Sequence, residues 1–212
     1  MIKYLLIIMN KFNKMIGRQF GNPHGFIGMV CCKIMNVINK KMYKSVANEI
    51  TANSDSTVLD VGYGNGYLLK NLYKKYACNL YGIEVSTDAK KLAQNKNKKG
   101  IKAEKIKLLE ADCCNMPFNA DTFDFVATVN TIYFWEDTLK GLSEIRRTLK
   151  RGGKFYNAVY TKEWLQKIPY TKEGFKFFDE EDYFRLGKNA GFTQVQIKEI
   201  KQNKNFIVIF TK

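Results

Sequence analysis

The chain of 212 residues has one histidine and five cysteines, and no two cysteines stand at the C-x-x-C spacing of a zinc site or a thiol oxidoreductase. The cysteine count is odd, and adjacent pairs stand at residues 31–32 and 113–114, where geometry discourages a disulfide within each pair. The sequence therefore argues against a zinc site and a disulfide framework. We expect no metal, and the free thiols indicate a reducing compartment, the cytoplasm.

Long hydrophobic runs are also missing. The apolar stretch at residues 2–9 contains Lys3, precedes no small-residue cleavage site, and is far shorter than the ~20 residues that span a bilayer. We expect no transmembrane segment, and Met9 is an alternative start of the chain. The length predicts one domain over residues 51–212 with a helical appendage or lid over residues 1–50.

Acidic residues are scarce relative to basic ones, 20 against 35, which gives a net charge of +15. Such a charge is typical of proteins that bind nucleic acid or an anionic membrane surface. However, arginine, the usual residue for bidentate contacts to phosphates and bases, occurs only five times, and the lysines are spread along the chain. The pattern favours a solvated lysine-rich surface over a nucleic-acid site.

The most informative stretch is a short apolar strand, residues 58–61, that runs into three glycines at alternating positions. Glycine permits positive φ angles and lets the backbone approach a ligand, and the helix that Tyr67 opens offers free N–H groups at its start. The glycines are Gly62, Gly64 and Gly66. Such a turn predicts a nucleotide-like ligand, although the pattern alone is weak evidence.

Two residues distinguish this loop from a dinucleotide-binding turn. The G-x-G-x-G spacing puts Tyr67 where the dinucleotide pattern requires a small residue for helix-to-strand packing. Asp60, two residues before the first glycine, would repel a pyrophosphate and favours a cationic or amine-bearing ligand. An NAD-linked oxidoreductase is therefore the weaker hypothesis.

Two further acids end the next predicted strands. Glu84 ends a strand at residues 80–84, one βαβ step after the glycine loop, where a carboxylate can accept hydrogen bonds from ribose hydroxyls. A helix N-cap is the alternative role, but Ser86 suits that position better. Asp112 follows the apolar residues 106–111. Each acid comes at the end of a strand, as a ligand-binding acid would.

With these pieces in register, the sequence resembles the class I S-adenosylmethionine-dependent methyltransferases, in the small-molecule group that includes enzymes of ubiquinone and menaquinone biosynthesis. The resemblance covers roughly residues 40–212 and is carried by segments 58–66, 81–86, 111–118, 123–126 and 149–153. It implies an enzyme that uses S-adenosylmethionine to methylate a small-molecule acceptor by direct displacement. An RNA-modifying methyltransferase and an arsenic-type enzyme that binds its substrate through thiolates are the alternatives.

The resemblance also implies roles for individual residues. The glycine loop would wrap the amino-acid and ribose parts of the cofactor, Glu84 would hold the ribose hydroxyls, and Asp112 with Cys113 would meet the adenine amino group. Asn130 would lie near the methionine moiety. Tyr63 departs from the family, which often has a small residue there, and either packs on the cofactor or folds away. The predicted cofactor-binding residues are Asp60, Gly62, Tyr63, Gly64, Gly66, Glu84, Val85, Asp112, Cys113 and Asn130.

We expect a Rossmann-like, doubly wound α/β fold: a seven-stranded sheet in the order 3-2-1-4-5-7-6, its last strand antiparallel, with an N-terminal helical lid. Helical patterns cover residues 26–50, 67–76, 86–99 ended by Gly100, 136–149 ended by Gly152 and Gly153, and 179–190. Strand patterns cover residues 58–61, 80–84, 106–111, 123–129, 154–160, 192–200 and 205–211, and residues 161–178 are predicted to be irregular.

Methyl transfer needs few catalytic side chains, because the donor is already activated and the protein mainly aligns the reactants and excludes water. If a general base is needed, the candidates are His24, in a helix-breaking joint expected over the active site, Tyr133, and as an alternative Tyr160. Among the aromatics after the fourth strand, we expect Tyr133 to face the pocket. Residues 12–30 and 161–178 are predicted to form mobile covers that select the acceptor.

Overall fold

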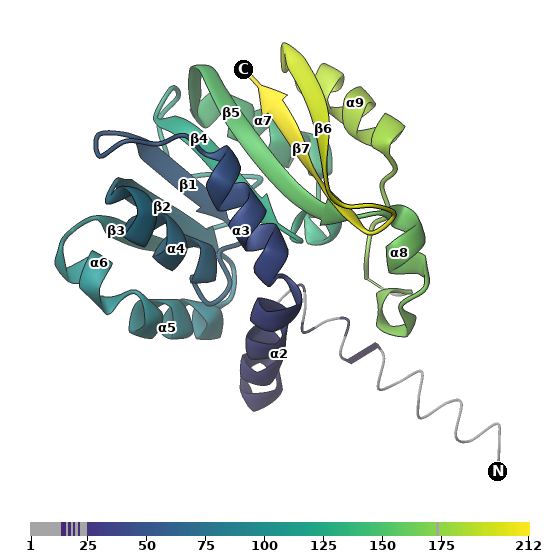
Figure 1. Cartoon of the computed structure of the whole chain (residues 1–212), viewed down its shortest axis with the longest axis horizontal. Coiled ribbons are helices and arrows are strands. Elements are labelled where there is room, and N and C mark those ends of the chain that lie inside the picture. Colours follow the sequence, from purple (N-terminus) through teal and green to yellow (C-terminus); the bar gives the residue numbers. More distant parts are fainter. Residues whose placement is uncertain (1–13, 16, 18, 20, 22–24, 173) are drawn as a thin grey trace.

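A seven-stranded sheet with the order β3-β2-β1-β4-β5-β7-β6 forms the centre of the molecule in the computed structural model, which describes residues 14, 15, 17, 19, 21, 25–172 and 174–212 (Figure 1). Its strands are β1 (Thr57–Val61), β2 (Asn79–Glu84), β3 (Ile106–Glu110), β4 (Phe123–Val129), β5 (Leu149–Tyr160), β6 (Gln194–Lys201) and β7 (Asn205–Thr211). The first five pair in parallel, and β7 runs antiparallel to both β5 and β6. The predicted strand order is confirmed.

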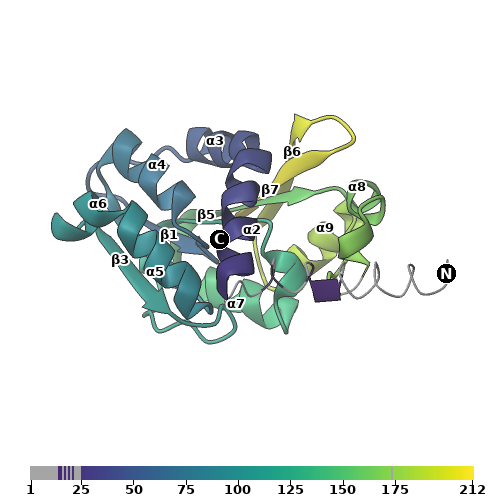
Figure 2. The same ribbon diagram turned by 90° about the horizontal axis from the view of Figure 1, so that it is seen from below.

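Helices pack on both faces of this sheet. In Figures 1 and 2, α3 (Lys40–Glu49) and α4 (Tyr67–Tyr76) lie on one face and α7 (Thr138–Thr148) lies on the other, where it contacts α9 (Glu180–Asn189). Beside α4, α5 (Thr87–Lys96) packs against β2 and β3, and the short α6 (Lys98–Lys102) packs against β3. The chain is therefore doubly wound, as the sequence predicts.

The burial of each strand follows its place in the sheet. β7 lies between β5 and β6, and six of its seven residues are buried, from Asn205 to Phe210. β6 is the edge strand, and its Gln, Lys and Glu side chains alternate with half-buried Val195 and Ile197. A strand covered on both faces reads as a continuous apolar run, whereas an edge strand alternates.

The N-terminal helical pattern is interrupted at Asn39. The sequence predicts one helix over residues 26–50, whereas α2 (Gly25–Ile38) ends before Asn39 and α3 begins after it. Asn39 is buried, and its side-chain oxygen accepts a 2.9 Å hydrogen bond from the hydroxyl of Tyr160, the last residue of β5. The break therefore ties α2 to the edge of the sheet where the parallel strands end.

Gly100 does not end a helix, contrary to the sequence prediction. The long helix stops at Lys96, and Gly100 lies inside α6, where an added Cβ would come 2.5 Å from Cδ1 of Ile106. Glycine is needed here for close packing of α6 on β3.

Gly152 and Gly153 do not precede the fifth strand, as predicted, but lie inside it. The strand begins at Leu149, and φ at Gly152 is +75°. The pairing of β4 with β5 shifts register between Phe123 and Phe125, so this part of the strand is irregular. This irregularity, with a left-handed glycine at its centre, accounts for the glycine pair that the sequence reads as a helix end.

The segment 161–178 is more ordered than predicted. It contains α8 (Lys162–Gln166), whose first turn is capped by the hydroxyl of Thr161, and the 3₁₀ helix η2 (Pro169–Thr171). Another 3₁₀ helix, η1 (Ile132–Phe134), follows β4. Within the described residues, no helix is both long and apolar enough to cross a membrane.

Candidate active site

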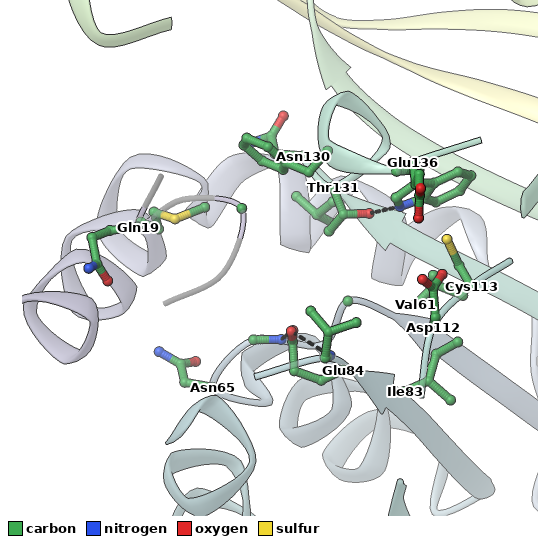
Figure 3. A pocket seen from close by; sticks show the side chains of 18 of the residues that line it. Gln19, Val61, Asn65, Ile83, Glu84, Asp112, Cys113, Asn130, Thr131 and Glu136 are labelled. Atoms are coloured by element: carbon green, nitrogen blue, oxygen red, sulfur yellow. Dashed lines mark hydrogen bonds between the residues drawn. The ribbon is translucent and has the colours of Figure 1, made fainter. Parts of the chain in front are cut away.

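A cavity of about 580 Å³ opens at the edge of the sheet where β1, β2, β3 and β4 end. Ligands of open α/β sheets bind at this edge, where the strand order reverses, here between β1 and β4. Figure 3 shows Glu84 on the lower wall, Asp112 and Cys113 to one side, Asn130 above, and Gln19 on the side opposite Cys113. Seven of the predicted residues line the cavity: Gly62, Gly64, Glu84, Val85, Asp112, Cys113 and Asn130.

The glycine loop presents bare backbone to this cavity. All three glycines are in the left-handed region, with φ of +68° at Gly62, +52° at Gly64 and +72° at Gly66. Nothing lies within 4 Å of the place where a Cβ of Gly64 would be. At Gly62 the same atom would come 2.6 Å from Thr131 Cγ2, so this glycine lets the loop close against the loop that follows β4.

Glu84 is held by backbone amides. Its Oε2 accepts a 2.9 Å hydrogen bond from the N–H of Gly64. Its Oε1 accepts hydrogen bonds of 2.9 and 3.1 Å from the N–H groups of Val85 and Ser86 (Glu84 is labelled in Figure 3). Burial raises the pKa of Glu84, and the three amide bonds oppose that rise. A carboxylate offers about four acceptor sites, so roughly one is left for a ligand hydroxyl.

Asp112 and Cys113 lie at the far end of the cavity, just after β3. The Oδ1 of Asp112 accepts a 2.7 Å bond from the N–H of Cys114, and the side-chain ligand atoms of these three residues lie within 4.8 Å of one another. Cys113 is buried, which is the main reason that its pKa is raised far above the usual thiol value. Both thiols are free.

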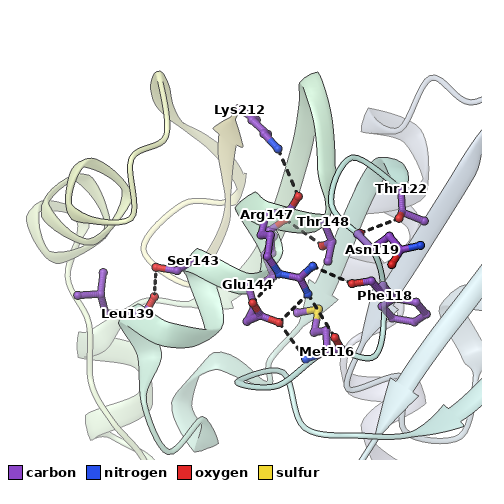
Figure 4. Close-up of polar contacts among 11 residues, drawn as sticks. Met116, Phe118, Asn119, Thr122, Leu139, Ser143, Glu144, Arg147, Thr148 and Lys212 are labelled. Atoms are coloured by element: carbon purple, nitrogen blue, oxygen red, sulfur yellow. Dashed lines mark hydrogen bonds and ion pairs between the residues drawn. The ribbon is translucent and has the colours of Figure 1, made fainter.

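An ion pair on α7 fixes the loop that carries this end of the site. In Figure 4, the guanidinium of Arg147 pairs with Glu144 at 2.7 Å and donates to the carbonyls of Phe118 and Met116 at 2.7 and 3.2 Å. Glu144 also accepts a 3.0 Å bond from the N–H of Met116. The bond from Arg147 is the main reason that the pKa of Glu144 is lowered. No helix links β3 to β4, so this clamp holds the connection instead.

Three predicted cofactor residues lie outside the cavity lining. Asp60 is buried, and its Oδ2 has no hydrogen-bond partner in the described part of the chain. Burial, followed by the charge of Glu84, raises its pKa well above the usual range. The ring of Tyr63 packs under Gly82, and its hydroxyl donates to the carbonyl of Leu109 at 3.4 Å. Gly66 packs against Asn97 and Ala93.

Among the described residues that line the cavity, the charged ones are all acidic: Glu84, Asp112 and Glu136. They stand in contrast to the net charge of +15 on the chain. A cavity walled by one sign of charge attracts ligands of the opposite sign. The site therefore suits a cation, and it disfavours the pyrophosphate of a dinucleotide or the backbone of RNA.

Comparisons with known proteins identify the family. A family model described as a methyltransferase domain matches residues 59–157. The 2-methyl-6-phytyl-1,4-hydroquinone methyltransferase of Arabidopsis thaliana is 33% identical over 148 residues, which cover 69% of this chain and 43% of that protein. An uncharacterized methyltransferase of Bacillus subtilis is 31% identical over 59% of this chain and 68% of its own length. The chain belongs to the class I S-adenosylmethionine-dependent methyltransferases.

Solved structures agree on the fold of this methyltransferase. A S-adenosylmethionine-dependent methyltransferase from Aquifex aeolicus superimposes with a TM-score of 0.71 at 24% identity, covering 84% of this chain and 95% of that one. The chain spans about two-fifths of the length of the plant relatives that it matches, 43% for the Arabidopsis enzyme. S-adenosylmethionine is the cofactor of the family, and its sulfonium is the kind of cation that the acidic cavity suits.

A second, smaller cavity of about 50 Å³ adjoins the first in this methyltransferase. Both are lined by Met35, Asn130 and Phe134. Apart from these shared residues, the small cavity is lined mostly by apolar and aromatic side chains, from Ile38 of α2 to Leu165, Ile168 and Phe175 of segment 161–178. None of its described lining residues carries a formal charge.

Tyr133 faces the small cavity rather than the large one. Its hydroxyl accepts a 2.6 Å bond from the N–H of Tyr160 and lies 3.2 Å from Oδ1 of Asn130. Phe134 and Trp135 line the large cavity, and Phe134 lines the small one as well. The reason is the 3₁₀ turn η1, which rotates successive side chains by about 120° and so sends neighbours to different sides.

His24 lies outside the described residues, whereas several cavity residues escape sequence reasoning. Gln19, Thr131 and Glu136 line the large cavity, and the indole N–H of Trp135 donates to Oγ1 of Thr131 at 3.2 Å (Figure 3). Asn65 could have been found, because it stands within the glycine loop. Gln19 lies in the segment 12–30 that the sequence predicts as a cover over the site, but no local pattern distinguishes it from its neighbours in that segment.

Proposed function

We propose that the chain transfers a methyl group from S-adenosylmethionine to a small, largely apolar acceptor, with the cofactor in the large cavity and the acceptor in the small one. One observation carries the proposal: an acidic cavity and an uncharged cavity meet at Met35, Asn130 and Phe134. A cationic methyl donor fits the first, and a nucleophile held in the second would face it across that junction.

The cofactor end of the large cavity supports this arrangement. Gly64 leaves open space where any side chain would intrude, so the donor can lie directly against the loop. Glu84 has roughly one acceptor site left for a ribose hydroxyl, and Asp112 and Cys113 stand where adenine would extend. Asp60, buried behind the loop with an unpartnered oxygen, adds negative potential that favours the ammonium and sulfonium.

The character of the acceptor follows from the small cavity. Burying a charge without a partner is costly, and the described lining offers none, so an uncharged acceptor is favoured. Relatives point the same way: one is named for a phytyl-substituted hydroquinone and another, from Caenorhabditis elegans, is a sterol 4-C-methyltransferase. A hydroquinone or similar ring with an apolar substituent is the acceptor class that we propose.

Methyl transfer requires few catalytic side chains from the protein. S-adenosylmethionine, when bound, supplies a methyl group already activated by its sulfonium. The residues around the junction align the acceptor and exclude water, and α2 contributes by placing Met35 and Ile38 against the small cavity, as expected of a lid.

Of the three candidate bases, Tyr133 is a poor one. Burial is the main reason that its pKa is raised well above the usual value, so its hydroxyl resists deprotonation at neutral pH. His24 remains the prediction: if it is the base, His24→Ala should lower turnover by ~10² and flatten the pH profile between about 5 and 8 while cofactor binding persists.

We also propose that the protein works in a reducing compartment, the cytoplasm, and without a metal or nucleic-acid partner. Cys78, Cys113 and Cys114 are free thiols, and two of them lie where oxidation would alter the end of the large cavity. The acidic cavity disfavours RNA as the substrate.

Calorimetry tests the cofactor, and transfer of a labelled methyl group tests the acceptor. We expect S-adenosylmethionine and S-adenosylhomocysteine to bind at micromolar affinity and NAD not to bind. A panel of alkyl-substituted hydroquinones, sterols and RNA should then give label only in the first class. Absence of S-adenosylmethionine binding would refute the function, whereas label in RNA alone would refute the acceptor.

A further inference from the structure

One face of α2 is apolar and exposed, which is unusual for a helix that lines two cavities. Five side chains form it, hereafter the α2 face, with exposed fractions from 39% at Val30 to 77% at Val37. Its members are Ile27, Val30, Ile34, Val37 and Ile38. At about 100° per residue these positions fall within one stripe roughly 100° wide. A contiguous apolar surface of this kind marks an interaction site.

Ile38, at the C-terminal end of the α2 face, also lines the small cavity, and another side of the same helix packs toward the body of the molecule. Gly28 is buried and Met35 is partly buried, and they lie about 130° and about 110° from the middle of the α2 face. Met35 lines both cavities. Figures 1 and 2 show α2 projecting from the body of the molecule beside α3 and α5. One side of α2 therefore faces the two cavities, and the α2 face is exposed to solvent.

Charge indicates what covers the α2 face. The chain carries +15, which opposes docking of a second copy and favours an anionic surface. Lys40, Lys41 and Lys44, at the start of α3 immediately after the α2 face, are all exposed. An apolar helix face flanked by lysines is typical of helices that lie in the interface of an anionic bilayer.

We propose that the α2 face docks this protein on anionic membranes, with the helix lying in the lipid interface and the three lysines on the headgroups. The small cavity would then open next to the lipid, because α2 supplies part of its wall. An apolar acceptor could pass from the bilayer to the cavity without crossing water. Membrane docking does not depend on methyl transfer, so each of the two proposals is tested by its own experiment.

Vesicle co-sedimentation tests the proposal on the full chain. We expect binding to phosphatidylcholine vesicles that contain about 30% phosphatidylglycerol, weak binding to phosphatidylcholine alone, and loss of most binding between about 0.1 and 0.5 M salt. The double variant Ile34→Glu/Val37→Glu should lower the partition coefficient at least tenfold. Phe184→Glu, at an equally exposed aromatic on α9 far from α2, is the matched control and should change it less than twofold.

The outcomes separate the rival occupants of the α2 face. Equal binding of the double variant and the control would mean that charge alone attracts the vesicles, and would overturn the proposal. The proposal would also be overturned if the wild-type protein were a dimer and the double variant a monomer. Failure of the wild-type protein to bind anionic vesicles would overturn it as well. Binding of S-adenosylhomocysteine by both variants, measured by calorimetry, verifies that they are folded and reports on the cofactor site independently.

Discussion

The two cavities of this methyltransferase are built by different means. The large cavity, proposed here as the cofactor end, is shaped by the backbone: left-handed glycines at the turn after β1 and amides of Gly64, Val85 and Ser86 that hold Glu84. The small cavity, proposed as the acceptor end, is shaped by side chains, with Tyr133, Phe134 and Phe175 packed at ring distances of 4.5 to 6.1 Å. Backbone geometry constrains a few residue types strictly, whereas side-chain packing has many solutions.

Glu84→Ala should produce the largest effect, because Glu84 is the proposed ribose ligand and also holds the loop through backbone amides. We expect cofactor affinity to fall ~10- to 100-fold from the lost charged hydrogen bond. The variant should also melt several degrees lower, since three amides lose their acceptor. This differs from the simple sequence expectation of a ligand residue, whose loss would leave stability intact.

Calorimetry and thermal unfolding measure the two effects. Glu84→Gln is the control, because it keeps the length of the side chain and one acceptor oxygen and should retain most of the stability. Unchanged affinity in the alanine variant would contradict the ribose assignment.

Gly64→Ala tests the bare backbone directly, and the chain offers a matched control in Gly152→Ala. Both glycines have positive φ, +52° and +75°, and neither has an atom within 4 Å of an added Cβ. The backbone strain should cost ~1–2 kcal/mol in each. Only Gly64 lines the large cavity, so only its variant should lose cofactor affinity, about tenfold. Equal affinities in the two variants would show that the methyl group at Gly64 does not meet the cofactor.

Phe175→Ala addresses the acceptor end. Phe175 lines the small cavity, stacks on Tyr133 at 5.7 Å, and does not line the large cavity. Loss of its contact area should raise the acceptor KM severalfold and leave the Kd of S-adenosylhomocysteine within twofold. Phe184→Ala, on α9, should change neither. An equal loss of cofactor affinity in Phe175→Ala would mean that the two cavities are not separate in function.

This contrast also explains what the sequence could predict. The glycine spacing, Asp60, Glu84 and Asp112 identify the ligand-binding edge of the sheet, because left-handed turns and strand ends leave a short, local pattern. Tyr133 lines the small cavity and not the large one, and the sequence could not distinguish the two, since the direction of a side chain in η1 depends on a turn that residue types do not fix. Gln19 and Phe175 lie in the two segments predicted as covers, residues 12–30 and 161–178, but no local pattern indicates which side chains of these segments line a cavity.

Asp60→Asn should have the smallest effect. At the proposed cofactor end, this variant should change thermal stability and cofactor affinity in opposite directions. Burial and the charge of Glu84 raise the pKa of Asp60. A carboxyl with a raised folded pKa contributes its full stability only below its unfolded pKa, about 3.9, and that contribution is lost as pH rises through the folded pKa. Asparagine cannot ionise, so the cofactor-free variant should melt a few degrees above the wild type near pH 8 and converge with it toward about pH 4. Its affinity for S-adenosylmethionine should meanwhile fall severalfold, because the negative potential behind the loop is gone. Thermal unfolding across this pH range, with calorimetry at its upper end, measures both; a stability gain that is the same at every pH would show that ionisation of Asp60 is not its cause.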